Sequence, residues 1–291
     1  MVKKARSWIQ FCALLIQNAN FKGFATGKIY QGAGKNVCVP GLNCYSCPGA
    51  VGACPIGALQ NFLSSRPIRF PYYVMGFLLF FGALLGRAVC GFLCPFGFVQ
   101  ELLHKIPFPK KKPEHFRLDR PLRWGKYLVL LLLVIILPML TAWTPTFCKF
   151  LCPAGTLEGG IPLVLLHGAK TNFALGLLFG WKMLVLLAVV IGSVLVFRPF
   201  CKYLCPLGAI YGMLNRVSLL RMQHDEQRCV HCGGCTRACP MQADPVRRPN
   251  SAECIRCGIC VSACPTDALH LGFRERVLPA DPSPAGDPVN E

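Results

Sequence analysis

The stretch CGFLCPFG at residues 90–97 decides the architecture of this chain, because it returns twice in nearly the same form. The copies are CKFLCPAG at 148–155 and CKYLCPLG at 201–208, so the shared pattern is C-x3-C-P-x-G. Cysteines four residues apart face the same way if the segment is helical, and the proline that follows is well placed to begin the next helix. Each copy therefore offers two thiols on one surface, which is half of a four-thiolate metal site.

All three copies lie near long apolar segments. The chain has 291 residues, of which 53% are hydrophobic and only 15% are charged, and its mean hydropathy is +0.45. This composition is too apolar for an ordinary soluble domain and is typical of a membrane protein. Three segments have the roughly 20 apolar residues that a bilayer span requires, namely 70–89, 124–143 and 173–197.

A fourth segment, beginning at Ser7, is less regular, because several polar residues interrupt it: Gln10, Gln17, Asn18, Asn20 and Lys22. It could span the membrane, lie in the interface, or act as a signal peptide, although no small-residue cleavage site follows it. We expect about four transmembrane helices. Arg87 and Lys182 then fall near span ends, where we expect them to anchor the helices at the interface, with contact to a quinone or a lipid headgroup as the alternative.

The distribution of charge predicts the orientation in the membrane. Residues 1–224 hold 24 Lys or Arg and 4 Asp or Glu, whereas residues 225–291 hold 7 and 9. The linker 105–126 carries eight basic residues and two acidic ones, so the positive-inside rule places it in the cytoplasm. We expect a multi-pass protein of the cytoplasmic membrane with both termini inside. Because no basic stripe has interleaved aromatics, the charge does not indicate a nucleic-acid site.

The carboxyl-terminal region carries the most specific motif. CVHCGGCTRACP at 229–240 and CIRCGICVSACP at 254–265 both read C-x2-C-x2-C-x3-C-P, the spacing of bacterial ferredoxins that hold two [4Fe-4S] clusters. In this pattern the cysteine before each proline ligates the cluster of the other motif. The first predicted cluster is held by Cys229, Cys232, Cys235 and Cys264. The second is held by Cys254, Cys257, Cys260 and Cys239. Structural zinc is the alternative for any single C-x2-C pair.

The chain thus divides into a transmembrane domain (1–223), an α+β ferredoxin domain (224–272) in the cytoplasm, and a tail (273–291) whose polar, proline-rich composition predicts disorder. The predicted topology sorts the remaining cysteines by membrane face. Two C-x3-C-P pairs meet on the inner face and complete a four-thiolate site: Cys90, Cys94, Cys201 and Cys205.

Six more candidates lie on the outer face: Cys38, Cys44, Cys47, Cys54, Cys148 and Cys152. They suffice for one further cluster with two thiols left over, and spacing alone leaves open which four bind. Buried apolar cysteines or disulfides are the alternatives. Cys12 has no partner within its apolar segment, so we expect it to be a packing residue.

Together, these features resemble the NapH/NosR-type polytopic membrane ferredoxins over about residues 1–272. The resemblance implies an electron carrier linked to menaquinol oxidation that serves a reductase or a flavoprotein. It also implies redox roles for the four inner cysteines and the eight ferredoxin cysteines. The third pair, Cys148 and Cys152, and the group that begins at Cys38 depart from the family's usual two-pair pattern.

We therefore expect a membrane-bound electron-transfer protein with two ferredoxin clusters and one or two further clusters at the membrane faces. A quinone is a possible further cofactor, and the partners are membrane lipid and a redox protein. The alternative is a redox sensor or an assembly factor for a partner reductase. No catalytic residue is assigned, so whether the chain is itself an enzyme, as part of a quinol dehydrogenase complex, stays open. A metal-ion reductase or transporter gains little support, because the spans lack carboxylates and histidines.

Overall fold

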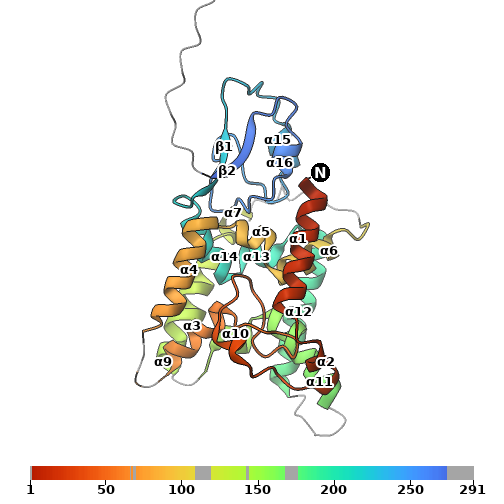
Figure 1. Cartoon of the computed structure of the whole chain (residues 1–291), viewed down its shortest axis with the longest axis vertical. Coiled ribbons are helices and arrows are strands. Elements are labelled where there is room, and N and C mark those ends of the chain that lie inside the picture. Colours follow the sequence, from red (N-terminus) through yellow and green to blue (C-terminus); the bar gives the residue numbers. More distant parts are fainter. Residues whose placement is uncertain are drawn as a thin grey trace, which may run out of the picture.

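The computed structural model describes residues 2–65, 67, 70–108, 119–141, 144–167 and 176–273. The chain is mostly helical, with a small ferredoxin unit (residues 220–273) at one end of a larger helical part (residues 2–219), as Figure 1 shows. Residues 274–291 of the predicted tail and residues 109–118 of the basic linker lie outside the described residues.

The helical part is built from short and medium helices in sequence order. Its first half contains α1 (Val2–Gln17), α2 (Phe21–Thr26), η1 (Ala33–Asn36), α3 (Pro55–Ser64), α4 (Tyr72–Leu85), α5 (Ala88–Phe92) and α6 (Pro95–His104). Its second half contains α7 (Asp119–Leu122), α8 (Gly125–Val129), η3 (Leu130–Ile136), α9 (Leu137–Thr141), α10 (Thr146–Phe150), η4 (Gly155–Gly160), α11 (Ile161–His167), α12 (Leu177–Leu195), α13 (Pro199–Tyr203) and α14 (Pro206–Leu214).

Two helical runs in the described residues are long and apolar enough to cross a membrane, Asp119–Thr141 and Leu177–Leu195. In their most apolar windows only 28% and 17% of residues are buried, so neither run is the core helix of a soluble protein. The first begins five residues before the predicted span. The expected span at 70–89 is shorter than predicted, because α4 ends at Leu85. The structure thus gives two candidate spans, and the predicted number of four is not established by them.

Helix α1 buries its polar side chains and exposes its apolar ones. Arg6, Gln10 and Gln17 are buried, whereas Trp8 and Ile16 are 67% and 72% exposed. A helix in water shows the opposite arrangement, so this outer face is suited to lipid. The glutamines that interrupt the sequence pattern are therefore internal hydrogen-bond donors. Cys12 lies on the exposed side, so the prediction that it is a packing residue is wrong.

The first candidate span contains a π-helical segment, η3, followed by a proline. Pro138 has no N–H, and in π geometry its partner five residues back would be the carbonyl of Leu133. Side chains satisfy that carbonyl instead: Gln60 Nε2 donates to it at 2.7 Å and Thr146 Oγ1 at 2.5 Å. These bonds tie α3 and α10 to the middle of the span.

The repeated C-P-x-G unit begins a helix in every described copy. In α6 and α14 the cysteine is the N-cap and the proline occupies the first helical position, where a missing N–H is harmless. The sulfurs of Cys94, Cys152 and Cys205 each accept the N–H of the glycine three residues on, at 3.4 Å. The motif therefore fixes each second cysteine at a helix N-terminus.

The ferredoxin unit is α+β, as the sequence predicts. Its elements are β1 (Leu220–His224), α15 (Gly234–Ala238), α16 (Ile259–Ser262) and β2 (Leu269–Phe273). The strands form an antiparallel pair with Leu220 opposite Phe273 and His224 opposite Leu269. Because β1 starts at Leu220, the folded unit begins four residues before the boundary expected at 224.

Buried ion pairs connect the two parts. Glu253 of the ferredoxin unit pairs with Arg87 at 3.1 Å and with Lys126, and both cations are fully buried. Arg256 donates to the carbonyls of Leu85, at 2.8 Å, and Asn215, at 2.7 Å. Removing one partner from a buried pair costs about 3–5 kcal/mol, so these contacts fix the ferredoxin unit on the helical part.

Candidate metal centres

Eight cysteines of the ferredoxin unit surround two small cavities. One cavity is lined by Cys229, Cys232, Cys235 and Cys264. The other is lined by Cys239, Cys254, Cys257 and Cys260. Each cavity thus gathers three cysteines of one motif and the fourth cysteine of the other. The structure brings together the same two sets that the ferredoxin spacing predicts.

The backbone repeats itself around these two cavities. His231 and Arg256, between the first two cysteines of each motif, have φ of 50° and 54°. Gly233 and Gly258, after the second cysteine, have φ of 68° and 73°. Left-handed backbone is costly for a residue other than glycine, and it persists where the surrounding structure requires it. The two motifs therefore impose the same wrap of backbone around their cavities.

Burial in the second cavity disfavours the thiolate form of its cysteines. Burial raises the pKa of Cys254 to about 11 and that of Cys260 to about 12, so the free thiols are neutral. A metal that binds them as thiolates must displace their protons. Among the described residues, no three His, Cys, Asp or Glu side chains are grouped as a site for a single metal ion. A four-iron cluster, whose thiolates sit at separate corners, is the group that these sets of four fit.

A third set, here called the proximal site, lies in the helical part beside the ferredoxin unit. It consists of Cys90, Cys94, Cys201 and Cys205, from the start of α6 and α14 and from the short helices before them. All four are at most 6% exposed. Each thiol of this set lies close enough to another to influence its charge. The pairing that topology predicts for the inner membrane face is therefore present in the structure.

Polar side chains position the proximal site from several helices. Gln100 Nε2 donates to Cys201 Sγ at 3.2 Å. From α1, Gln10 donates to the carbonyl of Gly91 at 2.8 Å and Gln17 to that of Leu93 at 2.7 Å. These bonds hold the turn that carries the first cysteine pair. None of these three glutamines was among the predicted site residues, because a lone glutamine in a sequence gives no sign of the distant segment to which it will hydrogen-bond.

The proximal site lies within an excess of buried positive charge. Among the described residues around it, six cations are buried, Arg6, Arg87, Lys126, Arg198, Lys202 and Arg256, beside three carboxylates, Glu101, Asp119 and Glu253. Arg198 adopts a left-handed φ of 49° and donates to the carbonyl of Cys90. Four thiolates around a cubane with two positive charges carry a net charge of −2. The residues therefore fit an anionic cluster electrostatically as well as by their thiols.

Arg87 connects the proximal site to the ferredoxin unit. Its guanidinium donates to the carbonyl of Cys201 at 3.1 Å, to that of Ala252, and to Glu253. The side chain is fully buried, so the prediction of an interfacial anchor at Arg87 is wrong. Gly91 packs directly against the carbonyl of Ile255, leaving no room for a side chain. Cys257, Cys90, Cys94 and Cys205 belong to one continuous hydrophobic core.

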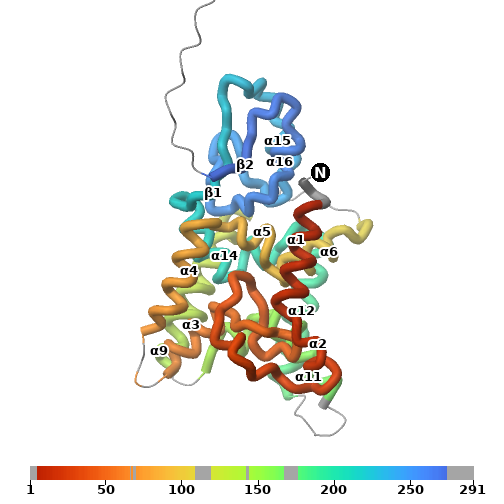
Figure 2. Tube along the Cα trace, viewed as in Figure 1, coloured from red at the N-terminus to blue at the C-terminus, as the bar shows by residue number. Residues whose placement is uncertain are grey.

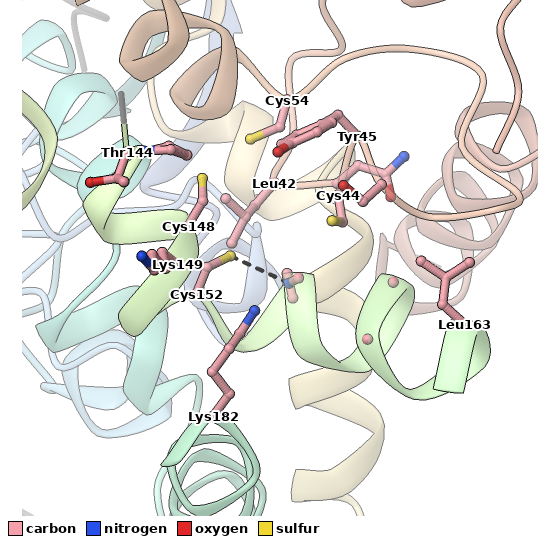
Figure 3. Close-up of a pocket in the computed structure, with 17 residues that line it drawn as sticks. Leu42, Cys44, Tyr45, Cys54, Thr144, Cys148, Lys149, Cys152, Leu163 and Lys182 are labelled. Atoms are coloured by element: carbon pink, nitrogen blue, oxygen red, sulfur yellow. Dashed lines mark hydrogen bonds between the residues drawn. The ribbon is translucent and has the colours of Figure 1, made fainter. Parts of the chain in front are cut away.

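The six cysteines of the predicted outer face divide into two groups. Cys44, Cys54, Cys148 and Cys152 line one cavity of about 330 Å³, here called the distal site, and Figure 3 shows their sulfurs directed toward its centre. Lys182, from α12, also lines this cavity and extends toward it. Cys38 and Cys47 are buried outside the cavity. All six of these cysteines have free thiols, so the structure contains none of the disulfides that were the alternative to cluster ligation.

Two comparisons identify the sequence family. A profile described as a 4Fe-4S binding domain matches residues 52–72, 70–114, 125–161 and 178–222, so each match contains a Cys-Pro pair. A profile described as a 4Fe-4S dicluster domain matches residues 221–265. No solved structure shows a significant match.

Several curated proteins are distantly similar. The methylamine utilization ferredoxin-type protein MauN of Paracoccus denitrificans is 30% identical over 64% of this chain and 60% of its own length. The uncharacterized protein MJ0750 of Methanocaldococcus jannaschii is 29% identical over 76% and 86%. The ferredoxin-type protein NapH of Haemophilus influenzae is 28% identical over 59% and 53%. The matched region therefore covers less than two thirds of MauN and of NapH.

These matches confirm the predicted resemblance and the 4Fe-4S class of the cofactors, whereas the number of clusters and the quinone stay predictions. The profile matches also cover every C-P-x-G unit of the helical part, including the two at the distal site. The chain therefore belongs to the ferredoxin-type 4Fe-4S proteins and is a distant homologue of MauN, NapH and NosR.

Proposed function

We propose that this protein relays electrons between its ferredoxin unit and a redox partner at or across the membrane, by way of the proximal site. The observation that carries the proposal is the contact between the two parts. The second ferredoxin cavity and the proximal site share one apolar core, and Arg87 hydrogen-bonds to both sides of their boundary. A carrier needs such a fixed, short connection between successive redox groups.

The exposure of the cysteines supports an order for the two ferredoxin sites along the relay. Cys232, of the first ferredoxin cavity, is exposed, whereas Cys257 and Cys260 of the second are buried. An exposed cluster suits exchange with a soluble partner, and a buried one suits transfer inside the protein. In the proposal, the first cavity faces a cytoplasmic partner and the second faces the proximal site.

The chemistry supplied by bound [4Fe-4S] clusters is one-electron oxidation and reduction without large rearrangement. A quinol gives up two electrons and two protons, so a quinol donor requires two successive one-electron transfers into the relay. The protein's own residues hold the thiols, exclude water and compensate charge. Gln100 and the buried arginines perform these tasks at the proximal site.

We also propose that four helices cross the membrane, with the ferredoxin unit in the cytoplasm. The two candidate spans support this arrangement, and so does the apolar outer face of α1. Lys126 and Lys202 of the helical part bind carboxylates near the ferredoxin unit, consistent with a basic cytoplasmic end.

The proposal is tested by adding a menaquinol analogue to anaerobic protein in lipid nanodiscs and following cluster reduction by stopped-flow absorbance. Cys201→Ala should abolish fast reduction of the ferredoxin clusters, because it breaks the proximal site. Cys12→Ala is the matched control and should leave the rate unchanged, because Cys12 is exposed and belongs to none of the four sites. Equal rates in wild type and Cys201→Ala would refute a relay through this site.

The alternative function is redox sensing or partner assembly. It is favoured by one relative, the regulatory protein NosR of Pseudomonas aeruginosa, which is 29% identical over 55% of this chain and 21% of its own length. A sensor does not require rapid exchange with the quinone pool. Clusters that are present in full but are reduced by quinol only over many minutes would favour the alternative.

A further inference from the structure

We infer that Cys44, Cys54, Cys148 and Cys152 hold a further [4Fe-4S] cluster, the one farthest from the ferredoxin unit, and that Cys38 and Cys47 are not ligands. This inference rests on the proposed electron relay, which it extends beyond the proximal site. The sequence leaves six cysteines open, so the choice of four comes from the structure. Three features of the distal site support this choice: an internal repeat, the space beside its thiols, and a direct contact with the proximal site.

The distal site repeats the design of the proximal site. Each contains two C-P-x-G units, which begin α6 and α14 at the proximal site and begin α3 and the π-helical run η4 at the distal site. Three of the four first cysteines lie four residues before the proline-linked one. At the distal site, Cys44 takes the place of that partner for Cys54, although the two cysteines are ten positions apart. In this unit a folded loop therefore brings the second cysteine into place, whereas a helical turn does so in the other three units.

Small residues leave space beside these thiols. A Cβ at Gly155 would lie 3.7 Å from both Cys44 Sγ and Cys152 Sγ, and a Cβ at Gly159 would lie 3.4 Å from Cys44 Sγ. The two glycines are four residues apart, so they face the cavity from one side of the helix. Gly160 also lines the cavity. The cavity of about 330 Å³ thus has thiols at its edges and no side chain on this wall.

Buried polar contacts hold the thiols in position. The side chain of Gln60 accepts the N–H of Cys148 at 3.3 Å while donating to Leu133, whose carbonyl Pro138 leaves without a backbone donor. Glu158 accepts the N–H of Cys44 at 2.7 Å. Lys182 contributes a positive charge at the cavity, which suits an anionic cluster.

The loop between α2 and α3 connects the distal site to the proximal one. Leu42 lines the distal cavity, and it belongs with Cys94 to one continuous buried core. The neighbouring Gly41 packs on the backbone of Cys94, and Tyr211 of α14 donates to the carbonyl of Pro40 at 3.1 Å. Figure 2 shows this loop rising from the far end of the molecule toward α14. The loop that lines the distal site therefore also packs directly on the proximal site.

Cys38 and Cys47 have other surroundings. Cys38 lies in a bridge of extended backbone opposite Ala53, and its N–H donates to the hydroxyl of Tyr73 at 3.1 Å. Cys47 Sγ lies 3.7 Å from Asn18 Oδ1. Neither lines the distal cavity. Both are buried, as a packing cysteine should be.

The test compares Cys44→Ala with Cys47→Ala in anaerobically purified full-length protein, because both residues lie in the same loop and Cys47 is the more buried. Iron, acid-labile sulfide and the electron paramagnetic resonance spectrum of the reduced protein are measured for each. We expect Cys44→Ala to lose about four irons and one spectral component, with the ferredoxin signals retained. Cys47→Ala should keep the iron content of the wild type. Cys152→Ala, on a different element, should reproduce Cys44→Ala.

Several results would overturn the inference. An unchanged iron content in both Cys44→Ala and Cys152→Ala would exclude the distal cluster, and equal iron loss in Cys44→Ala and Cys47→Ala would exclude the choice of ligands. If Cys44→Ala lost the ferredoxin signals together with the distal iron, that variant would be misfolded. The iron content of Cys152→Ala would then decide whether the distal cluster exists. A wild type that transfers electrons through the proximal site but contains about 12 irons per chain would sink the distal cluster and leave the proposed relay intact.

Discussion

Glu253 is the residue on which the docking of the ferredoxin unit most depends, and its replacement by glutamine tests the connection between the two parts. The carboxylate pairs with Arg87 and with Lys126, both fully buried. In Glu253→Gln the two cations keep a polar neighbour, but the carboxylate that balances their positive charge is gone. Breaking a buried pair by removing one partner costs about 3–5 kcal/mol. The docked state should therefore weaken by roughly a hundredfold to several thousandfold relative to the undocked one.

Hydrogen–deuterium exchange with mass spectrometry measures this change directly, because amide protection reports the free energy of local opening. We expect protection in segment 250–260 to fall by roughly two orders of magnitude or more, while the antiparallel pair of strands β1 and β2 stays protected. Glu226→Gln is the matched control, since Glu226 is exposed in the same unit and should change stability by less than about 0.5 kcal/mol.

The effect should depend on pH. Burial alone would raise the pKa of Glu253, but Arg87 and Lys126 hold it below the ordinary value. Because the folded pKa is depressed, the contribution of the pair is complete above the unfolded pKa of about 4.3 and is lost as pH falls through the folded value. Wild type and Glu253→Gln should therefore converge in acid. A loss of protection below about threefold at neutral pH, or a difference that persists in acid, would refute this account of docking.

Three further predictions concern the metal centres. Gln100→Leu removes the N–H donor to Cys201 Sγ, so the reduction potential of the proximal cluster should fall by roughly 40 mV, equivalent to about 1 kcal/mol. A redox titration followed by electron paramagnetic resonance measures this shift. An unchanged potential would contradict the hydrogen bond. Gln60→Leu removes one donor to the Leu133 carbonyl and the acceptor of the Cys148 N–H. The free energy of unfolding should therefore fall by about 1–3 kcal/mol, and iron should be lost first from the distal site on heating. Loss of iron from the proximal site first would be inconsistent with this role. Gly159→Val should fill the distal cavity and remove about four irons, whereas Gly180→Ala, where nothing lies within 4 Å of an added Cβ, should retain them; equal iron in both variants would argue against a cluster beside Gly159.

The ferredoxin and proximal sets could be predicted from the sequence because their geometry is local or follows from topology. The C-x2-C-x2-C-x3-C-P spacing sets which cysteine crosses between the two motifs, and the structure gathers the same groups. For Cys90, Cys94, Cys201 and Cys205, helix ends on one membrane face were enough to bring two pairs together. The ferredoxin sets thus follow from cysteines a few residues apart, and the proximal set follows from the number of membrane crossings between its two pairs.

The distal site could not be predicted because its ligands depend on how a long loop folds. Cys44 replaces a cysteine that should lie four residues before Cys54, and nothing in the spacing favours it over Cys38 or Cys47. The supporting residues are equally hidden. Gln10, Gln17 and Gln60 bind carbonyls in other helices. Arg87 looks like an interfacial charge in the sequence but is buried between two sites, because carboxylates and carbonyls from distant segments surround it.

The measurement that tests the central claim most directly is the number of irons and acid-labile sulfides per chain in anaerobically purified wild-type protein. Four sites of four cysteines each predict about 16 of each. A value near 8 would mean that only the ferredoxin unit binds clusters, and it would contradict the claim that the repeated C-x3-C-P-x-G pairs are halves of iron–sulfur sites.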